Sequence, residues 1–187
     1  MGRALLIFYF LTSLGCKMQP NEIFPYTFKT ITGKEATIHM NKTTRGMVFI
    51  FLVPDCPFSQ YYTTTVNQVY SSYFFRRFQF YGVVPGNLYT LAEIDSFKRH
   101  HNFIPEILID EKYNLSSNYK VSVVPQVIVT SPLGEMLYSG KIDDQAVSPG
   151  QKKYHPTKFY LLDALKSISE GKPVTIKKTR PVGCFIE

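Results

Sequence analysis

The strongest constraint on the fold is an apolar run that ends just before a cysteine and a proline. Residues 47–53 are apolar, which is typical of a β-strand buried on both faces of a sheet. Pro57 suits the first position of a helix because it has no N–H to leave unpaired, and residues 60–77 are predicted to be helical. Cys56 therefore lies at a helix N-terminus, where free N–H groups and the helix dipole stabilise a thiolate.

Cys56 begins a Cys-Pro-x-Ser sequence, in which Ser59 occupies the place of the second sulfur of a Cys-Pro-x-Cys redox pair. Thiol-disulfide exchange needs one thiolate to attack and a second thiol to release the mixed disulfide. Ser59 can donate a hydrogen bond to a thiolate but cannot resolve a disulfide, and a nearby Asp55 would oppose thiolate formation. The candidate resolving residue is Cys184, far along the chain. The residues alone leave open whether Cys184 pairs with Cys56 or stays unpaired.

Composition limits the class of protein. The chain has 187 residues, of which 44% are hydrophobic and 19% charged, as expected of one globular domain with a normal core. Three cysteines without a Cys-x-x-Cys pair exclude a disulfide-rich scaffold and the usual zinc-finger spacings. The net charge of +7 is spread along the chain without a recognition motif, so we expect no nucleic-acid partner.

The first residues predict export. Arg3 precedes an apolar stretch, residues 4–14, that has the length of a signal-peptide core and is too short to span a bilayer. The following Gly15-Cys16 resembles the lipobox of bacterial lipoproteins. We therefore expect a signal peptide over residues 1–15, a lipid on Cys16 and a linker over residues 16–25. The chain would then be a lipoprotein of the bacterial cell envelope, anchored in the membrane and facing the periplasm, where disulfides persist. An ordinary signal peptide with a coincidental cysteine is the alternative.

The remaining pattern alternates strands with helices and ends in a hairpin, which indicates an α/β domain with a mixed sheet. We expect one domain over residues 26–171 and a C-terminal tail without a strong pattern over residues 172–187. Asp143-Asp144, after the hairpin, is expected to be a solvated turn. Further strands are predicted at residues 27–32, 36–40, 78–84, 107–109, 127–130 and 136–139, and further helices at residues 88–101, 113–119 and 157–170.

Residues 26–170 resemble the thioredoxin-like superfamily. The matching parts are the strand–Cys56-Pro57–helix turn, the Val123-Val124-Pro125 segment, and the hairpin over residues 127–140. The resemblance implies a thioredoxin-like fold, in which helices flank a central mixed β-sheet.

The same resemblance implies substrate-binding residues. The peptide bond before Pro125 would be cis and would face Cys56, which exposes the Val124 backbone to an incoming peptide strand. Pro57, Ser59, Val124 and Pro125 are therefore the candidate binding residues around Cys56. A trans proline on an edge strand is the alternative for Pro125.

A narrower resemblance links the two cysteines. Cys56-Pro57-Phe58-Ser59 and the phrase Gly183-Cys184-Phe185-Ile186 are similar to bacterial redoxin-domain proteins of the AhpC/TSA-like or thiol-disulfide oxidoreductase-like kind, in which both phrases occur together. This resemblance implies redox chemistry through Cys56, with Cys184 as the candidate resolving cysteine. The partners would be protein or small-molecule thiols and disulfides, with no cofactor.

Two other functions remain open at this point. A peroxiredoxin-type peroxidase usually has Thr or Ser three residues before its reactive cysteine, where this chain has Val53. A copper-binding or assembly protein could use Cys56 and Cys184 with imidazole, although Gln60 replaces the second cysteine of the Cys-x-x-x-Cys pair in copper-delivering relatives. The candidate imidazoles are those of His155, His100 and His101. We expect no metal site and an oxidoreductase.

Overall fold

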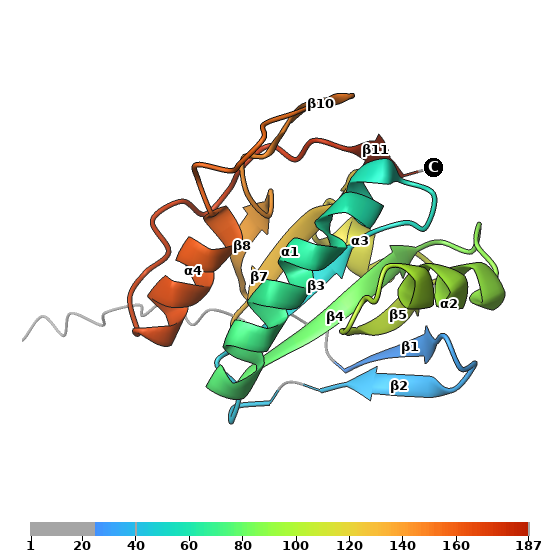
Figure 1. The fold of residues 1–187 in the computed structure, drawn as a ribbon. Helices are drawn as coiled ribbons and strands as arrows, with labels where there is room; N and C mark the ends of the chain where they lie inside the picture. The colour runs from blue at the N-terminus through green and yellow to red at the C-terminus, as the bar shows by residue number, and fades with distance from the viewer. Residues whose placement is uncertain (1–24, 40, 187) are drawn as a thin grey trace, which may run out of the picture.

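The computed structural model describes residues 25–39 and 41–186. Its centre is a seven-stranded mixed sheet in the order β2-β1-β5-β4-β3-β7-β8 (Figure 1). Strands β3, β4 and β5 are parallel to one another, whereas β1, β7 and β8 each run antiparallel to their neighbours. The strands are β1 (Tyr26–Thr30), β2 (Glu35–Ile38), β3 (Gly46–Phe51), β4 (Phe78–Pro85), β5 (Glu106–Asp110), β7 (Gln126–Thr130) and β8 (Met136–Gly140).

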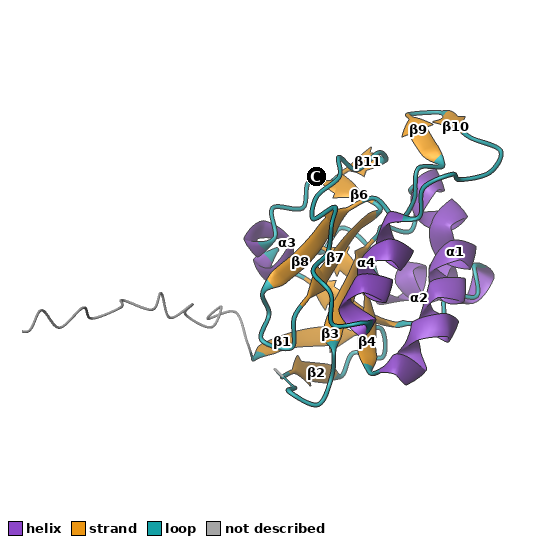
Figure 2. Cartoon of the chain, turned by 90° about the vertical axis from the view of Figure 1, so that its left-hand side faces the viewer, coloured by secondary structure: helices purple, strands orange, loops and turns teal. Residues whose placement is uncertain are grey.

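Helices cover both faces of the sheet (Figure 2). The longer helices α1 (Pro57–Tyr73), α2 (Leu91–His100) and α4 (Tyr160–Ser169) lie on one face, and the short α3 (Asn114–Asn118) lies on the other. Strand β3 is apolar throughout because successive side chains point to opposite faces and both faces are buried. The side chains on the α1 face are Val48 and Ile50, followed by Leu52 just after the strand, and those on the α3 face are Met47, Phe49 and Phe51.

All four predicted helices begin one to three residues away from the predicted start, and for two of them the cause is local. Helix α1 begins at Pro57 rather than residue 60, because Pro57 takes the first helical position directly after Cys56. Helix α2 begins at Leu91 rather than residue 88, because Thr90 and Glu93 form a reciprocal capping box there.

The C-terminal tail is more structured than its sequence pattern suggested. Ser139 donates its N–H to Lys177 O at 3.0 Å, and Thr179 donates its N–H to Ser139 O at 2.9 Å, so the tail runs beside β8. Further on, the two-residue strand β11 (Cys184–Phe185) pairs antiparallel with β6 (Val123–Val124). A second small pair, β9 (Ala146–Ser148) with β10 (Gln151–Lys152), projects near the start of α1 (Figure 2).

The prediction of a solvated turn at Asp143-Asp144 is wrong, since both residues are buried. The hydroxyl of Tyr62 on α1 donates to Asp143 Oδ1 at 2.6 Å. Asp144 Oδ1 accepts the backbone N–H groups of Thr157 and Lys158 at 2.7 and 3.0 Å. These carboxylates therefore connect the end of β8 to α1 and to the segment before α4.

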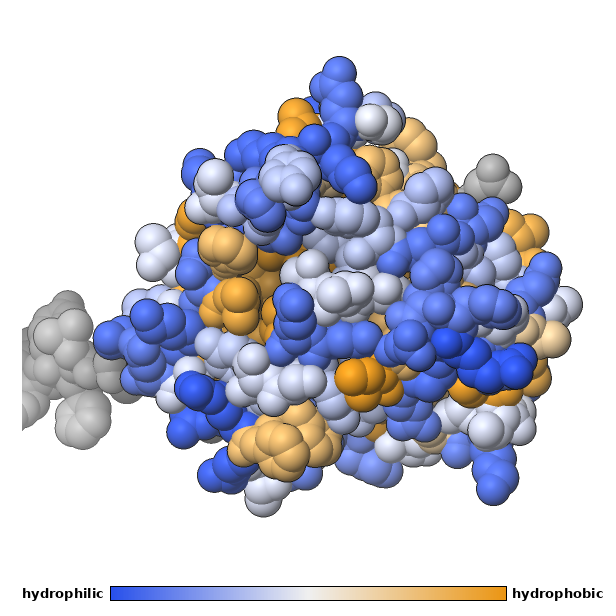
Figure 3. All heavy atoms as spheres, viewed as in Figure 1, coloured by the Kyte–Doolittle hydropathy of each residue, from blue (hydrophilic) through white to orange (hydrophobic). Residues whose placement is uncertain are grey.

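The face that Figure 3 shows is mainly hydrophilic, with apolar side chains exposed in separate groups. Within the described residues, no helix is long and apolar enough to cross a membrane. The predicted signal peptide over residues 1–15, Cys16 and most of the linker over residues 16–25 lie outside the described residues.

Candidate active site

Cys56 lies between strand β3 and α1, the longest helix of the described residues. It is the N-cap residue of α1, with an extended backbone (φ −77°, ψ 116°), and its carbonyl accepts the Gln60 N–H at 3.0 Å. Pro57 occupies the first helical position and no side chain caps this helix start. The sulfur therefore stands where the positive end of the helix dipole stabilises a thiolate, as predicted.

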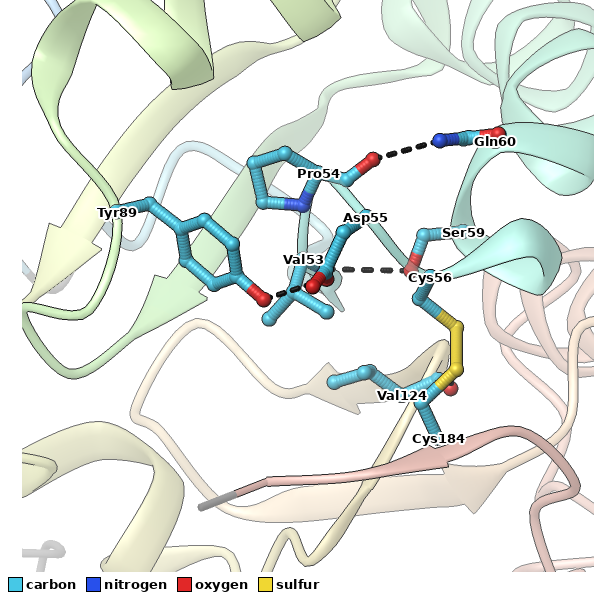
Figure 4. Close-up of a disulfide and its surroundings, with 9 residues drawn as sticks. All are labelled: Val53, Pro54, Asp55, Cys56, Ser59, Gln60, Tyr89, Val124 and Cys184. Atoms are coloured by element: carbon cyan, nitrogen blue, oxygen red, sulfur yellow. Dashed lines mark hydrogen bonds between the residues drawn. A yellow bond between two sulfur atoms is a disulfide. The ribbon is translucent and has the colours of Figure 1, made fainter.

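Hydrogen bonds hold the turn that presents Cys56 (Figure 4). Val53 donates its N–H to Ser59 Oγ at 3.2 Å, and Gln60 Nε2 donates to the Pro54 carbonyl at 2.8 Å. Ser59 is buried, and its hydroxyl binds the backbone of the segment that precedes Cys56. The turn is thereby fixed without a second sulfur.

A disulfide joins Cys56 to Cys184, which are 128 positions apart in sequence and have Cα atoms 6.1 Å apart (Figure 4). The partnership that the sequence left open is therefore present. Cys56 is only 1% exposed, whereas Cys184 is half-buried. The tail cysteine thus lies on the outer side of the bond and covers the helix cysteine.

The Val124-Pro125 peptide bond is cis, as the resemblance implied. The Val124 carbonyl oxygen lies 3.5 Å from Cys56 Sγ, so this segment faces the cysteine. Cys184 pairs with Val124, and Ile186 donates its N–H to the Ser122 carbonyl at 3.1 Å. The chain's own tail therefore occupies the strand position that the resemblance assigns to an incoming peptide.

Two hollows flank the disulfide. One, of about 380 Å³, is lined mainly by apolar side chains that include Val53, Leu88 and Ile186. The other, of about 400 Å³, lies between the start of α1 and the β9–β10 pair and is lined by residues that include Phe58, Tyr61 and Gly183. Cys184 is one of the residues that line both hollows.

Asp55 is exposed beside Cys56, and it has a specific partner that sequence reasoning missed. The Tyr89 hydroxyl donates to Asp55 Oδ1 at 2.5 Å (Figure 4). Tyr89 lies in the segment between β4 and α2, and no motif marked it, because the contact depends on two segments far apart in sequence.

A peroxidase would use an arginine, and a copper site an imidazole, beside the two sulfurs. Within the described residues, no group of three or more His, Cys, Asp and Glu side chains could hold a metal ion. The described residues that line the two hollows include no histidine and no arginine. The site therefore offers two sulfurs, a strand-pairing backbone and apolar walls.

Comparison with known proteins relates the chain to solved structures. No family model matches the sequence, and no curated protein matches it either. A hypothetical protein of Sinorhizobium meliloti is 18% identical with a TM-score of 0.75, over 86% of this chain and 89% of that one. An uncharacterised conserved protein of Geobacillus kaustophilus is 17% identical with a TM-score of 0.74, over 87% and 88%. A secreted disulfide oxidoreductase of Mycobacterium tuberculosis, homologous to Escherichia coli DsbE, is 18% identical with a TM-score of 0.53, over 81% and 98%.

Proposed function

Because this chain has the thioredoxin-like fold that its sequence predicted, with helices flanking a central mixed sheet, we propose that it is a thiol-disulfide oxidoreductase. Cys56 is the nucleophile and Cys184 is the resolving cysteine. The observation that carries this proposal is the disulfide between them, formed at the N-terminus of α1 and beside the cis proline. The secreted disulfide oxidoreductase among the similar structures supports it.

The proposed cycle begins with both cysteines reduced. The Cys56 thiolate attacks a partner disulfide, whose S–S bond breaks as a mixed disulfide forms and one partner sulfur leaves as a thiolate. Cys184, once deprotonated, attacks Cys56 Sγ, closes the Cys56–Cys184 bond and releases the second partner sulfur. The partner gains two electrons and the protein's dithiol loses two. A partner dithiol drives the same steps in reverse, and no cofactor takes part.

The binding residues have different proposed roles. Val124 and Pro125 present the backbone edge at the sulfur, and exposed Pro57 forms part of the wall beside it. Ser59 acts indirectly, by holding Val53. The substrates that fit this arrangement are protein or small-molecule thiols and disulfides.

Thiol counting by mass spectrometry tests the function. In buffers with different ratios of reduced to oxidised glutathione, Cys56 and Cys184 of the wild-type protein should interconvert between a disulfide and two free thiols. Cys184→Ser should accumulate a mixed disulfide on Cys56, since nothing releases it, and Cys56→Ser should lose turnover. A Cys56 that forms no mixed disulfide would refute the proposal. Sulfenic acid at Cys56 with turnover of peroxide would favour a peroxidase instead.

We also propose that the protein works in the bacterial cell envelope as a lipoprotein anchored through Cys16. The apolar residues 4–14 and Gly15-Cys16 support this location, as does the secreted relative. Cell fractionation tests it: wild-type protein should sediment with membranes and carry a lipid mass on Cys16. Cys16→Ser should abolish both the sedimentation with membranes and the lipid mass. If wild-type protein and Cys16→Ser divide equally between the membrane and soluble fractions, the lipid anchor is refuted.

A further inference from the structure

The C-terminal strand shows how an extended chain fits against Cys56. Cys184 and Phe185 pair antiparallel with Val124 and Val123, and the Ile186 N–H bonds to the Ser122 carbonyl. The Cys184 sulfur is bonded to Cys56 in this register. The tail thus has the geometry that a partner peptide would need in a mixed disulfide with Cys56.

The tail is also held upstream of the strand. Thr179 Oγ1 lies 2.8 Å from the Tyr138 hydroxyl and accepts the Lys141 N–H at 2.8 Å. Beyond this point the tail from Pro181 to Ile186 is half-buried, apart from Phe185, which is 81% exposed. A short strand with few buried groups can be replaced by another chain once its disulfide is reduced.

The position of Gly183, directly before Cys184, has no room for a side chain. A Cβ atom there would overlap the Val124 carbonyl oxygen and would lie 3.1 Å from Pro125 Cδ. Val124 is fully buried and its carbonyl also faces Cys56 Sγ at 3.5 Å, so this backbone has little room to move. In a partner peptide bound in the same register and direction, a side chain at the residue before the cysteine would meet the same Val124 carbonyl oxygen.

The two positions after the cysteine differ from each other. Phe185 is exposed, so little packing depends on its side chain. Ile186 packs against the apolar cluster that contains Val53, Cys56 and Val124, and it lines the hollow beside Leu88. An apolar side chain is therefore favoured two residues after the cysteine.

From these contacts we propose that the surface beneath residues 183–186 binds an extended partner segment with the pattern Gly-Cys-x-apolar, of which the tail is a resident copy. This proposal rests on the proposed function, because the partner cysteine forms its mixed disulfide with Cys56. In that step the Cys56 thiolate displaces the sulfur bonded to the partner cysteine, which leaves with the electron pair of the broken bond. Cys184 then returns to Cys56, and the partner leaves as a thiolate.

The test uses full-length, reduced Cys184→Ser protein and short peptides whose cysteine is bonded to 5-thio-2-nitrobenzoate. The probe is a capped Val-Gly-Cys-Phe-Ile peptide, compared with versions that carry Ala for Gly, Ser for Ile, or Ala for Phe. The reaction of each peptide with glutathione gives its intrinsic reactivity. Binding of the peptide through its own cysteine is followed by mass spectrometry, and its rate by release of the coloured thiolate.

We expect the Gly peptide to modify Cys56 about tenfold faster than the Ala-for-Gly peptide, because overpacking typically costs enough for that ratio. The Ser-for-Ile peptide should also be slower, and the Ala-for-Phe peptide should match the parent. Equal corrected rates for Gly and Ala peptides would overturn the proposal. If no peptide and no small mixed disulfide reacts with Cys56, the proposed function itself fails. Should Cys184→Ser not fold, reduced wild-type protein gives the comparison through the rate of thiolate release alone, because Cys184 releases the bound peptide.

Discussion

Ser59 stands where a second sulfur would complete a redox pair, and its hydrogen bond explains how a serine stabilises the structure at this position. Its Oγ accepts the Val53 N–H at 3.2 Å inside a buried turn. A buried N–H left without an acceptor destabilises a protein more than an ordinary hydrogen bond stabilises it. The hydroxyl therefore fixes the turn that carries Cys56.

Ser59→Ala should lower the free energy of unfolding by about 1–3 kcal/mol, because the Val53 N–H loses its acceptor. Urea unfolding of the oxidised proteins measures the change. Thr64→Ala, at an exposed position of the same helix, is the control and should change stability by about 0.5 kcal/mol or less. Equal effects of the two substitutions would contradict this role of Ser59.

Gly183→Ala should weaken the Cys56–Cys184 disulfide. The added methyl group meets the Val124 carbonyl, so the equilibrium with glutathione should shift toward the dithiol by about tenfold or more. Quantifying thiols across glutathione buffers measures this shift. Phe185→Ala, which changes an exposed side chain next to the same cysteine, should leave the equilibrium unchanged. A normal disulfide equilibrium in Gly183→Ala would show that the tail can bind in another register.

At the scale of elements, Asp144 connects the end of β8 to the segment before α4. Burial opposes ionisation of Asp144, but hydrogen bonds from Lys153, Thr157 and Lys158 outweigh it and hold the pKa of this carboxyl well below its usual range. Lys153 Nζ lies 2.5 Å from Asp144 Oδ2. The ionised carboxylate is therefore part of the folded structure.

The stability that Asp144 provides should depend on pH in a defined direction. Because its pKa is lower in the folded than in the unfolded chain, the contribution is complete above the unfolded value of about 4 and is lost as the pH falls below it. Asp144→Asn should lower the Tm by about 4 °C at neutral pH, as expected from weaker charged hydrogen bonds in a chain of this size.

Thermal unfolding from about pH 7 to about pH 3 tests this, since the gap between Asp144→Asn and wild type should narrow as the pH falls. Glu135→Gln, at an exposed position after β7, is the control and should give a curve parallel to wild type. A gap that stays constant, or widens in acid, would show that the Asp144 charge is unimportant.

For the molecule as a whole, the sequence predicted what depends on local pattern. The apolar run at β3 and the β7–β8 hairpin appear as expected, and a helix follows Cys56 although it begins earlier than residue 60, because periodicity and turn residues determine these features locally. The two-residue strands β6 and β11 carry no periodicity, and each forms only because the other is present. The burial of Asp144 was missed for the same reason, since its partners lie further along the chain.

The redox state should affect the stability of the whole molecule. The disulfide links residues 128 positions apart, and closing so long a loop restricts the unfolded chain strongly. Reduction should therefore lower the free energy of unfolding by about 2–5 kcal/mol, measured by urea titration with and without dithiothreitol. The Cys56→Ser/Cys184→Ser double variant should have the lower free energy of unfolding both with and without dithiothreitol. If dithiothreitol changes the stability of this double variant, the reductant acts on a group other than the Cys56–Cys184 disulfide. Because the same bond holds β11 over Cys56, reduction should weaken the fold and open the peptide-binding edge together.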